Sequence, residues 1–276
     1  MDLNHFLKVF NRILVGRGRT YSSVELFFDY SRLFVRSIVY HKARKLHDSF
    51  FSRSRCSLLG FRVRFTSYGE LLDLVEEIFI YEVYKSAPVS GVIIDCGANI
   101  GLSVIYFRKN FPTARIVAFE PSATEFKILR DNIDYNKIEN IQLFNFALGD
   151  KEGTAHLVSS GDGSASLTHR TFFTHHSSDG PIVSVRRLSE YIESKIALLK
   201  IDIEGAEVSV LRELQQSSKI KLISQIVVEF HHDNADIPLE EFVEILVSNG
   251  FLCRQEHDRR HPNTAFSIVY ATRKLI

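Results

Sequence analysis

The residues best suited to chemistry begin with the stretch Asp95-Cys96-Gly97-Ala98-Asn99-Ile100-Gly101, which directly follows the apolar run Val92-Ile93-Ile94. This order of residue types predicts a strand that ends in an acid, then a glycine-rich turn, then a helix. Gly97 and Gly101 have no Cβ, so the backbone can come close to a ligand there. A second acid, Glu120, ends the next apolar run. We therefore expect two carboxylates at one edge of a sheet, beside the turn.

These two carboxylates restrict the kind of ligand. At ~4 Å and an effective dielectric of about 20, two like charges repel by roughly 4 kcal/mol, so Asp95 opposes a dinucleotide pyrophosphate. A ligand with an amino group and a sulfonium would be attracted instead. Glu120 can accept both ribose hydroxyls, as in other doubly wound nucleotide sites. The combination favours S-adenosylmethionine over NAD.

Ionisable and apolar side chains alternate in Lys200-Ile201-Asp202-Ile203-Glu204. Side chains two positions apart share a face of a strand, so Lys200 and Asp202 can form an ion pair. Burying such groups is costly unless they are paired, and ligand-facing strand ends are where this cost is usually accepted. The pattern favours a functional role over a purely structural ion pair. Glu207 is expected to stabilise the N-terminus of the following helix.

The next apolar run ends in Val228-Glu229-Phe230-His231-His232. A hydroxyl is a poor nucleophile, and a base that takes its proton assists group transfer. We expect His231 to be that base because its unperturbed pKa is suitable, with Glu229 orienting it and Asp202 or Glu204 as second candidates. The alternative is that both histidines are loop residues. A Mg²⁺ ion held by Asp202, Glu204 or Glu229 is also considered, because hard cations prefer carboxylates.

Apolar periodicity predicts the elements that position these residues. Strands are expected at 59–65, 92–95, 115–119, 141–148, 197–201, 223–230, near 252 and at 266–272, and helices at 70–84, 100–109, 123–135, 206–215 and 239–249. Continuous apolar strands between amphipathic helices indicate a parallel sheet covered on both faces, and therefore an α/β, doubly wound fold. Right-handed crossovers place the loops after the strands along one edge, where such sheets bind ligands.

The N-terminal part differs from the rest in charge. Residues 1–66 hold 13 Lys/Arg and 4 Asp/Glu, and the remainder holds 21 and 29. We expect two amphipathic helices here, and domains at 1–66 and 67–276. Such basic helices can form a cap that packs on the core, or they can lie at an anionic membrane surface. Neither helix has the uninterrupted apolar run that a membrane-spanning helix needs.

Composition excludes several classes of protein. The three cysteines are widely spaced, which excludes a disulfide scaffold or a cysteine-based zinc site and favours a reducing compartment such as the cytoplasm. The formal net charge of +1 provides no bulk electrostatic case for a nucleic-acid partner. The first residues lack the layout of a secretory signal. The sequence does not indicate an oligomeric state.

Three further segments have local interpretations. Residues 152–187 are rich in Gly, Ser and Thr and are expected to form an acceptor-binding lid, with His169, His175 and His176 at its surface. Ser122 begins a capping box with Glu125 and can also contact a cofactor. Phe146 is expected either in the core or beside an adenine ring. Asn132 is expected to be a solvated helix residue.

Four motifs together resemble the FkbM family of S-adenosylmethionine-dependent methyltransferases. They are Val92 to Gly101, Ala118-Phe119-Glu120-Pro121, Ala147-Leu148-Gly149-Asp150 and Lys200-Ile201-Asp202-Ile203-Glu204-Gly205-Ala206-Glu207. The resemblance covers residues 70–272 and implies a Rossmann-like class I methyltransferase with a mostly parallel seven-stranded sheet and an antiparallel final hairpin. It also implies O-methylation of a hydroxyl on a sugar, glycan, glycolipid or natural product. Cys96 and Ser189 depart from the usual family pattern.

The residues expected to bind the cofactor lie at three strand ends: Asp95, Gly97, Ala98, Asn99, Gly101, Ser103, Glu120, Pro121, Ser122, Phe146, Ala147 and Asp202. The expected catalytic set is His231, Asp202, Glu204 and Glu229. We prefer a glycan or glycolipid acceptor, and a small natural product is the alternative. Two other functions are alternatives. One is an NAD-dependent dehydrogenase, which Asp95 opposes, and the other is a catalytically silent nucleotide-binding adaptor in glycan assembly.

Overall fold

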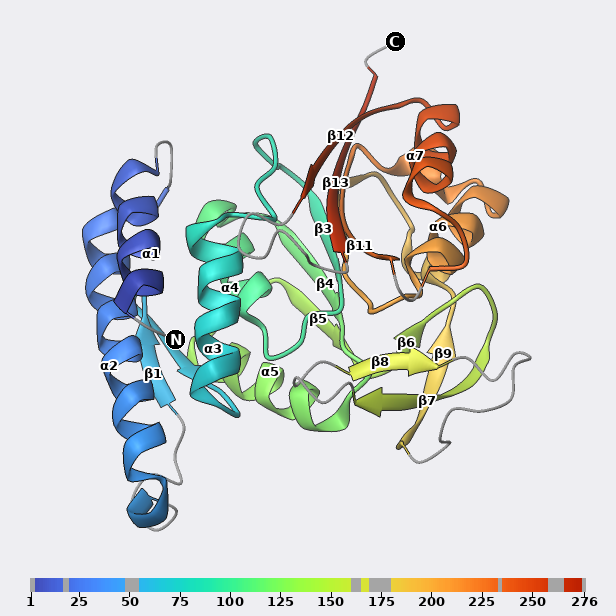
Figure 1. The fold of residues 1–276 in the computed structure, drawn as a ribbon. Coiled ribbons are helices and arrows are strands. Elements are labelled where there is room, and N and C mark those ends of the chain that lie inside the picture. Colours follow the sequence, from blue (N-terminus) through green and yellow to red (C-terminus); the bar gives the residue numbers. More distant parts are fainter. Residues whose placement is uncertain are drawn as a thin grey trace. The chain divides into compact units, whose positions relative to one another are not determined.

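The computed structural model describes residues 3–16, 20–47, 55–159, 165–168, 180–232, 235–257 and 266–274 (Figure 1). The chain divides into two compact units. Unit 1 comprises Met1–Lys85, Ile100–Pro112 and Lys127–Glu139, and unit 2 comprises Ser86–Asn99, Thr113–Phe126 and Asn140–Ile276. Both units are therefore built from segments that are separate in the sequence.

Unit 2 contains a seven-stranded sheet in the order β12-β13-β11-β10-β3-β4-β5. Its strands are β3 (Val92–Cys96), β4 (Arg115–Phe119), β5 (Ile141–Phe144), β10 (Ile196–Ile201), β11 (Gln225–His231), β12 (Phe251–His257) and β13 (Phe266–Arg273). Strands β5, β4, β3, β10 and β11 are parallel, and β12 and β13 form an antiparallel hairpin that pairs with β11. The predicted mostly parallel, Rossmann-like sheet is confirmed. The strand order reverses between β3 and β10, which is where doubly wound sheets bind ligands.

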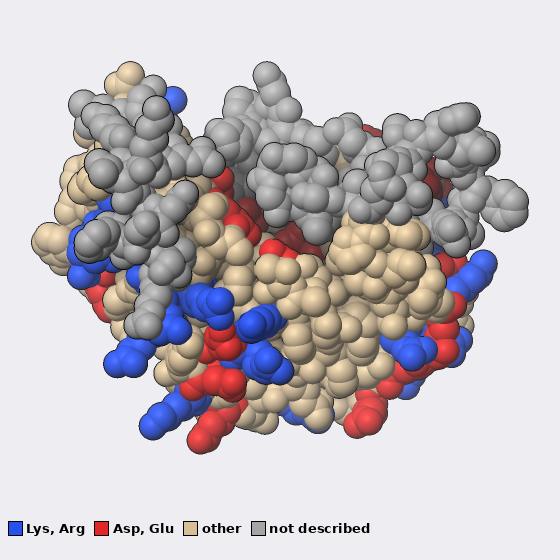
Figure 2. Space-filling view, turned by 90° about the horizontal axis from the view of Figure 1, so that it is seen from below, with Lys and Arg blue, Asp and Glu red and all other residues tan. Residues whose placement is uncertain are grey.

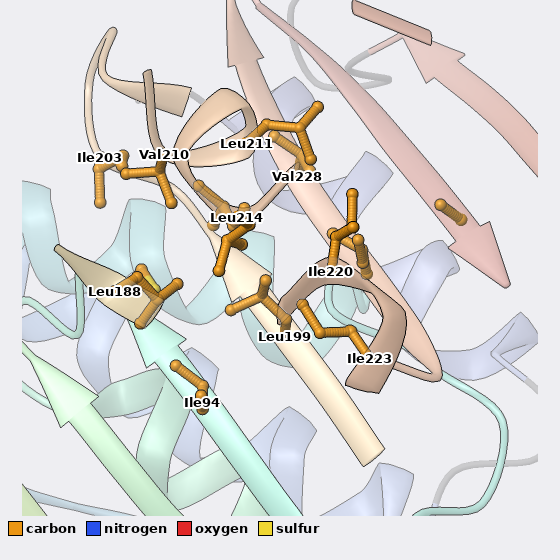
Figure 3. Packing of buried hydrophobic residues seen from close by; sticks show 14 of the residues in the cluster. Ile94, Leu188, Leu199, Ile203, Val210, Leu211, Leu214, Ile220, Ile223 and Val228 are labelled. Carbon is orange, nitrogen blue, oxygen red and sulfur yellow. The ribbon is translucent and has the colours of Figure 1, made fainter. Parts of the chain in front are cut away.

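The core of unit 2 lies between this sheet and α6 (Glu207–Gln216), α7 (Leu239–Ser248) and η3 (Lys219–Leu222). Figure 3 shows Leu199 and Val228 of the sheet close to Leu211 and Leu214 of α6. All four side chains are buried, and burying each one contributes roughly 1.5–3 kcal/mol. This packing holds β10 and β11, whose ends carry several of the predicted site residues.

A second sheet of unit 2 has the order β6-β9-β7-β8. It consists of β6 (Ala147–Leu148), β7 (Gly153–Ser159), β8 (Ala165–Thr168) and β9 (Ile182–Arg186), and η2 (Leu188–Tyr191) follows β9. The predicted single strand 141–148 is therefore wrong, because β5 and β6 belong to different sheets. The side chain of Asn145 explains the break, since its amide donates to the carbonyls of Glu120 and Pro121 and holds the chain in a turn.

The predicted lid at 152–187 contains β7, β8 and β9, and β7 pairs antiparallel with both others. Its role as a lid stays a prediction. His169, His175 and His176 lie outside the described residues.

Unit 1 contains the helices α1 (Leu3–Val15), α2 (Ser23–His47), α3 (Tyr68–Val75), α4 (Leu102–Asn110) and most of α5 (Ala123–Tyr135). The predicted helix 70–84 is divided, because α3 passes into a π-helical turn, η1 (Glu76–Ile80). Glu76 is buried in that turn and accepts hydrogen bonds from Tyr30 of α2 at 2.5 Å and His5 of α1 at 3.0 Å. The two N-terminal helices thus pack within unit 1, against η1, and the division into domains at 1–66 and 67–276 stays a prediction.

Two other predictions in unit 1 are wrong. The segment 59–65 is part of a hairpin of β1 (Arg55–Leu58) and β2 (Phe61–Arg64), because Leu59 and Gly60 both have positive φ and form its turn. Asn132 is fully buried rather than solvated. Its side chain accepts from the Arg64 amide and donates to the carbonyls of Arg64 and Ile100.

The described residues were searched for a membrane-spanning helix and for a face of one charge. No helix among the described residues is long and apolar enough to cross a bilayer. On the face in Figure 2, basic and acidic side chains are interspersed among the residues drawn in colour. The absence of a nucleic-acid partner stays a prediction.

Candidate functional site

The predicted site residues of unit 2 meet at the carboxyl edge of the parallel strands. Asp95 and Cys96 of β3 are in register with Lys200 and Ile201 of β10. The same two residues of β3 are in register with Ala118 and Phe119 of β4 on the other side. The Gly97 turn, Glu120 and Asp202 therefore begin at the same level of the sheet, as the sequence predicts.

The turn after β3 is held by the protein itself. Gly97 has φ +82°, and the amides of Gly97 and Ala98 both donate to the Phe119 carbonyl. A Cβ on Gly97 would lie 1.8 Å from the Asp202 carbonyl oxygen. A glycine was expected here so that a ligand could come close to the backbone. The structure gives a prior reason, because the chain after β10 passes too close for any side chain at this position.

Gly101 and Ser103 belong to unit 1, where they begin α4. Gly101 is the N-cap at φ +91°, and a Cβ there would lie 2.7 Å from the Leu129 side chain. Ser103 is buried in the first turn. Packing therefore accounts for this glycine too, and cofactor contact by Gly101 and Ser103 stays a prediction.

Glu120 is buried at the end of β4 and organises two loops. Its carboxylate accepts hydrogen bonds from the amides of Asn99 and Ser122, both at 2.8 Å. Burial raises its pKa to about 7, although these two hydrogen bonds act in the opposite direction. Each carboxylate oxygen has more than one acceptor position, so Glu120 can hold these amides and still accept ribose hydroxyls. The Ser122 hydroxyl donates to the Glu125 carboxylate and the Ser122 amide donates to Glu120, so the reciprocal backbone bonds of a capping box stay a prediction.

A buried lysine links the two central strands. The Lys200 ammonium lies 3.1 Å from Asp95 Oδ1 and 3.3 Å from Asp202 Oδ2, and it donates to the Gly97 carbonyl at 2.5 Å. Burial alone would lower the pKa of Lys200, but the two carboxylates raise it above its ordinary value. The predicted Lys200–Asp202 pair is present. Asp95 is fully buried against Lys200, so the structure gives it a positioning role.

A cavity opens beside this network. It is lined by residues from four strand ends: Gly97, Phe119, Pro121, Phe146, Ala147, Leu148, Asp202, Ile203 and Glu204. Phe146 packs against Phe119 with ring centroids 5.5 Å apart and against Tyr191 at 5.3 Å. Phe146 is therefore both a cavity wall and part of an aromatic cluster, and its position beside an adenine ring stays a prediction.

His231, at the end of β11, is surrounded by carboxylates. Its Nδ1 donates to Glu207 Oε1 at 2.9 Å, and its Nε2 lies 3.4 Å from Glu204 and 3.5 Å from Glu229. Burial alone would lower the pKa of His231, but the carboxylates raise it to about 12. A general base must be neutral, so this charge state weighs against His231 in that role. Asp202 and Glu204 line the cavity and are better placed to accept a proton.

Glu207 has a larger role than the sequence analysis gave it. It is fully buried and accepts from the amides of Ile203 and Gly205, as expected of a residue at a helix start. Its contact with His231 was missed. The two residues lie on different elements, and only the sheet order brings them together.

Comparison with known proteins agrees with this geometry. Residues 95–256, more than half of the chain, match the model of the methyltransferase FkbM domain. The chain belongs to the FkbM methyltransferase family.

Two relatives whose names include methyltransferase match most of the chain. "Methyltransferase 1" of Beauveria bassiana is 27% identical over 226 residues, which are 72% of this chain and 88% of that protein. "31-O-demethyl-FK506 methyltransferase FkbM" of Streptomyces tacrolimicus is 27% identical over 249 residues, which are 78% and 94%. Among solved structures, M. jannaschii TYW2 in complex with AdoMet has a TM-score of 0.43 and 13% identity, covering 81% of this chain and 87% of that one.

Proposed function

We propose that this chain is an S-adenosylmethionine-dependent O-methyltransferase that acts on a hydroxyl of a small molecule. The observation that carries the proposal is the carboxyl edge of β3, β4 and β10, where a tight turn, a buried acid and an aromatic-walled cavity adjoin two accessible carboxylates. The printed name of the Streptomyces tacrolimicus relative, a 31-O-demethyl-FK506 methyltransferase, supports a hydroxyl as the acceptor.

The residues at this edge fit the donor. Glu120 can accept the ribose hydroxyls, Phe146 and Phe119 provide an apolar wall for the adenine, and Asp202 presents a carboxylate to cationic groups. When bound, S-adenosylmethionine supplies a methyl group activated by its sulfonium. A pyrophosphate would meet the same acidic residues, which is why NAD is disfavoured.

The acceptor hydroxyl is placed at the Asp202 and Glu204 side of the cavity. These side chains are about one fifth and one quarter exposed, so a ligand in the cavity can reach them. Holding the hydroxyl in line with the methyl group is the main contribution to rate, and proton removal is secondary. We assign proton acceptance to Asp202 or Glu204, with His231 and Glu229 setting the charge around them.

The acceptor class is a natural product or a sugar hydroxyl. The printed name of the Streptomyces tacrolimicus relative favours a natural product, whereas the preference for a glycan or glycolipid rests on the basic N-terminal segment alone. Incubation of the full chain with methyl-labelled donor and fractionated small-molecule and glycan extracts distinguishes the two. Label that enters neither fraction, in a protein that binds S-adenosylhomocysteine, would favour the silent-adaptor alternative.

Binding and turnover test the proposal directly. S-adenosylhomocysteine should raise Tm and NAD should not. His231→Ala should retain methyl transfer at a reduced rate, whereas Asp202→Asn should lose most of it. An equal response to NAD, or full activity in Asp202→Asn, would contradict the assignment.

We also propose that one face of α1 and α2 contacts anionic membranes. Val24, Phe28, Val35 and Val39 form an exposed stripe at helical spacing on α2, although the opposite face of the helix is buried. Residues 1–66 carry an excess of nine basic residues, which complements anionic lipid. The full chain should float with vesicles of phosphatidylglycerol and phosphatidylcholine. Combining Phe28→Asp with Val35→Asp should leave the protein in the soluble fraction. Equal flotation of that variant would refute this contact.

A further inference from the structure

A set of three metal-ligating residue types lies at the Asp202 and Glu204 side of the cavity. One oxygen each from Asp202 and Glu204 and one ring nitrogen of His231 lie within 4.8 Å of one another. His231 Nε2 is 3.4 Å from Glu204 Oε2. Donors that share a cation at about 2.0–2.2 Å stand roughly 3 Å or slightly more apart, so a small movement would bring these atoms to coordinating distance.

Glu207 orients the imidazole in the way that metal-bound histidines require. Because its carboxylate accepts a hydrogen bond from His231 Nδ1–H, with the two heavy atoms 2.9 Å apart, the Nε2 atom is the one that faces Glu204. Histidines that bind metals almost always donate their other ring N–H to such a carboxylate or carbonyl, which sets the tautomer. Glu207 is itself fixed by the amides of Ile203 and Gly205.

The charge of the cluster is a separate observation that favours a bound cation. Among the described residues, carboxylates outnumber cationic side chains here: Asp95, Asp202, Glu204, Glu207 and Glu229 stand against Lys200 and protonated His231. A metal ion at Nε2 would replace one proton of His231. Glu207 has no exposed surface, and its Oε2 atom has no hydrogen-bond donor among the described residues. A buried carboxylate is costly, and the Nδ1–H hydrogen bond connects Glu207 to an imidazole that becomes more polarised when its Nε2 binds a metal ion.

We propose that Asp202, Glu204 and His231 bind a divalent transition-metal ion, with Glu207 as a positioning residue. The donor set combines an imidazole, which suits Fe²⁺ or Zn²⁺, with two carboxylates, which also suit Mn²⁺. Mg²⁺ prefers oxygen ligands alone and retained water. This changes the expectation of Mg²⁺ that the carboxylates alone suggest. The inference rests on the proposed function in one respect: Asp202 and Glu204 line the cavity, so an acceptor hydroxyl would become a further ligand and lose its proton more easily.

Binding of Mn²⁺ to the full chain tests the proposal without turnover. The EDTA-treated, dialysed protein is titrated with MnCl₂ and followed by EPR and by calorimetry, with MgCl₂ in parallel. We expect one saturable Mn²⁺ site per chain that is at least tenfold tighter than Mg²⁺. Glu204→Gln and His231→Gln should weaken it more than tenfold, and Glu207→Gln by 10- to 100-fold.

Matched controls keep the result interpretable. Glu193→Gln and His156→Gln change the same residue types elsewhere in unit 2 and should leave Mn²⁺ affinity unchanged. Far-UV circular dichroism checks folding, and Glu204 is the most exposed of the three ligands, with about one quarter of its side chain accessible. Any of three results would overturn the proposal. They are no Mn²⁺ binding by the wild type, equal wild-type affinities for Mn²⁺ and Mg²⁺, or an unchanged Mn²⁺ affinity in Glu204→Gln.

The same samples separate this inference from the proposed function. S-adenosylhomocysteine affinity is measured on each protein by calorimetry. A chain that binds S-adenosylhomocysteine but no Mn²⁺ refutes the metal site alone. A chain that binds Mn²⁺ at this site but no S-adenosylhomocysteine supports the metal site and refutes the proposed donor.

Discussion

Replacing Lys200 with methionine should destabilise the protein by about 4 kcal/mol at pH 7. The ammonium group lies between the fully buried Asp95 and the partly buried Asp202, and it also donates to the carbonyls of Cys96 and Gly97. Methionine has a similar length, so little cavity is created and the lost charge dominates. Removing one member of a buried ion pair costs roughly 3–5 kcal/mol, because the remaining charge is left uncompensated.

The dependence on pH follows from the pKa of Lys200. Burial lowers this pKa and the carboxylates raise it more, so the folded-state pKa lies above the unfolded value of about 10.4. The stabilisation by Lys200 is then fully present below about pH 10.4 and is lost only as pH rises further. The stability difference between wild type and Lys200→Met should therefore be constant from pH 7 to 9.

Urea denaturation at pH 7 and pH 9 measures this difference, and calorimetry with S-adenosylhomocysteine measures the effect on the site. The loss of the Gly97 carbonyl contact should weaken binding at least tenfold. Lys151→Met is the matched control, since Lys151 is exposed in unit 2 and should change stability by less than about 0.5 kcal/mol.

A double variant provides the sharper comparison. Combining Asp95→Asn with Lys200→Met removes both buried charges and should recover at least half of the lost stability. If the double variant is no more stable than Lys200→Met, or if Lys200→Met costs less than about 1 kcal/mol, the ion pair is not what holds these strands.

Three other changes have defined outcomes. Gly97→Ala should abolish S-adenosylhomocysteine binding and lower Tm, because the new Cβ would collide with the Asp202 carbonyl and φ is positive. The control is Gly69→Ala, which places a Cβ in open space on a helix and should not lower Tm. The raised pKa of Glu120, about 7, means that wild-type stability should fall as pH rises from roughly 4.3 to 7, and Glu120→Gln should remove this slope in urea titrations. Asn132→Ala should cost about 3 kcal/mol by leaving buried backbone groups unpaired, and Asn136→Ala, at a more exposed position, less than about 1 kcal/mol. Equal losses in the two asparagine variants would contradict the burial argument.

Local patterns were sufficient for much of the fold. The strand at Arg115–Phe119 and the helix at Ala123–Tyr135 were predicted with their observed bounds, because each has a clear apolar period and a clear stop signal. The failures occurred where a side chain distant in sequence overrides the local period. Asn145, for example, bonds to the chain after β4 and divides an apolar run that otherwise reads as a single strand.

The site shows the same division. The sequence placed Asp95, Glu120, Asp202 and His231 at strand ends, and a parallel sheet necessarily brings such ends to one edge. It also related Lys200 to Asp202, because their spacing is local. The partners that set the charge states of Lys200 and His231 could not be predicted from local spacing, because they lie on other elements.

By itself, the sequence determined the α/β class, the order of strands and helices along the chain, and the acidic residues of the sheet edge, because apolar periodicity and turn residues act over a few positions. Only the tertiary structure decided that Lys200 also binds Asp95 and that Glu207 holds His231. Those pairs depend on β10 lying between β3 and β11, and strand order is a consequence of long-range packing. The chemistry of a charged group follows from its neighbours, and here the neighbours come from other strands and loops.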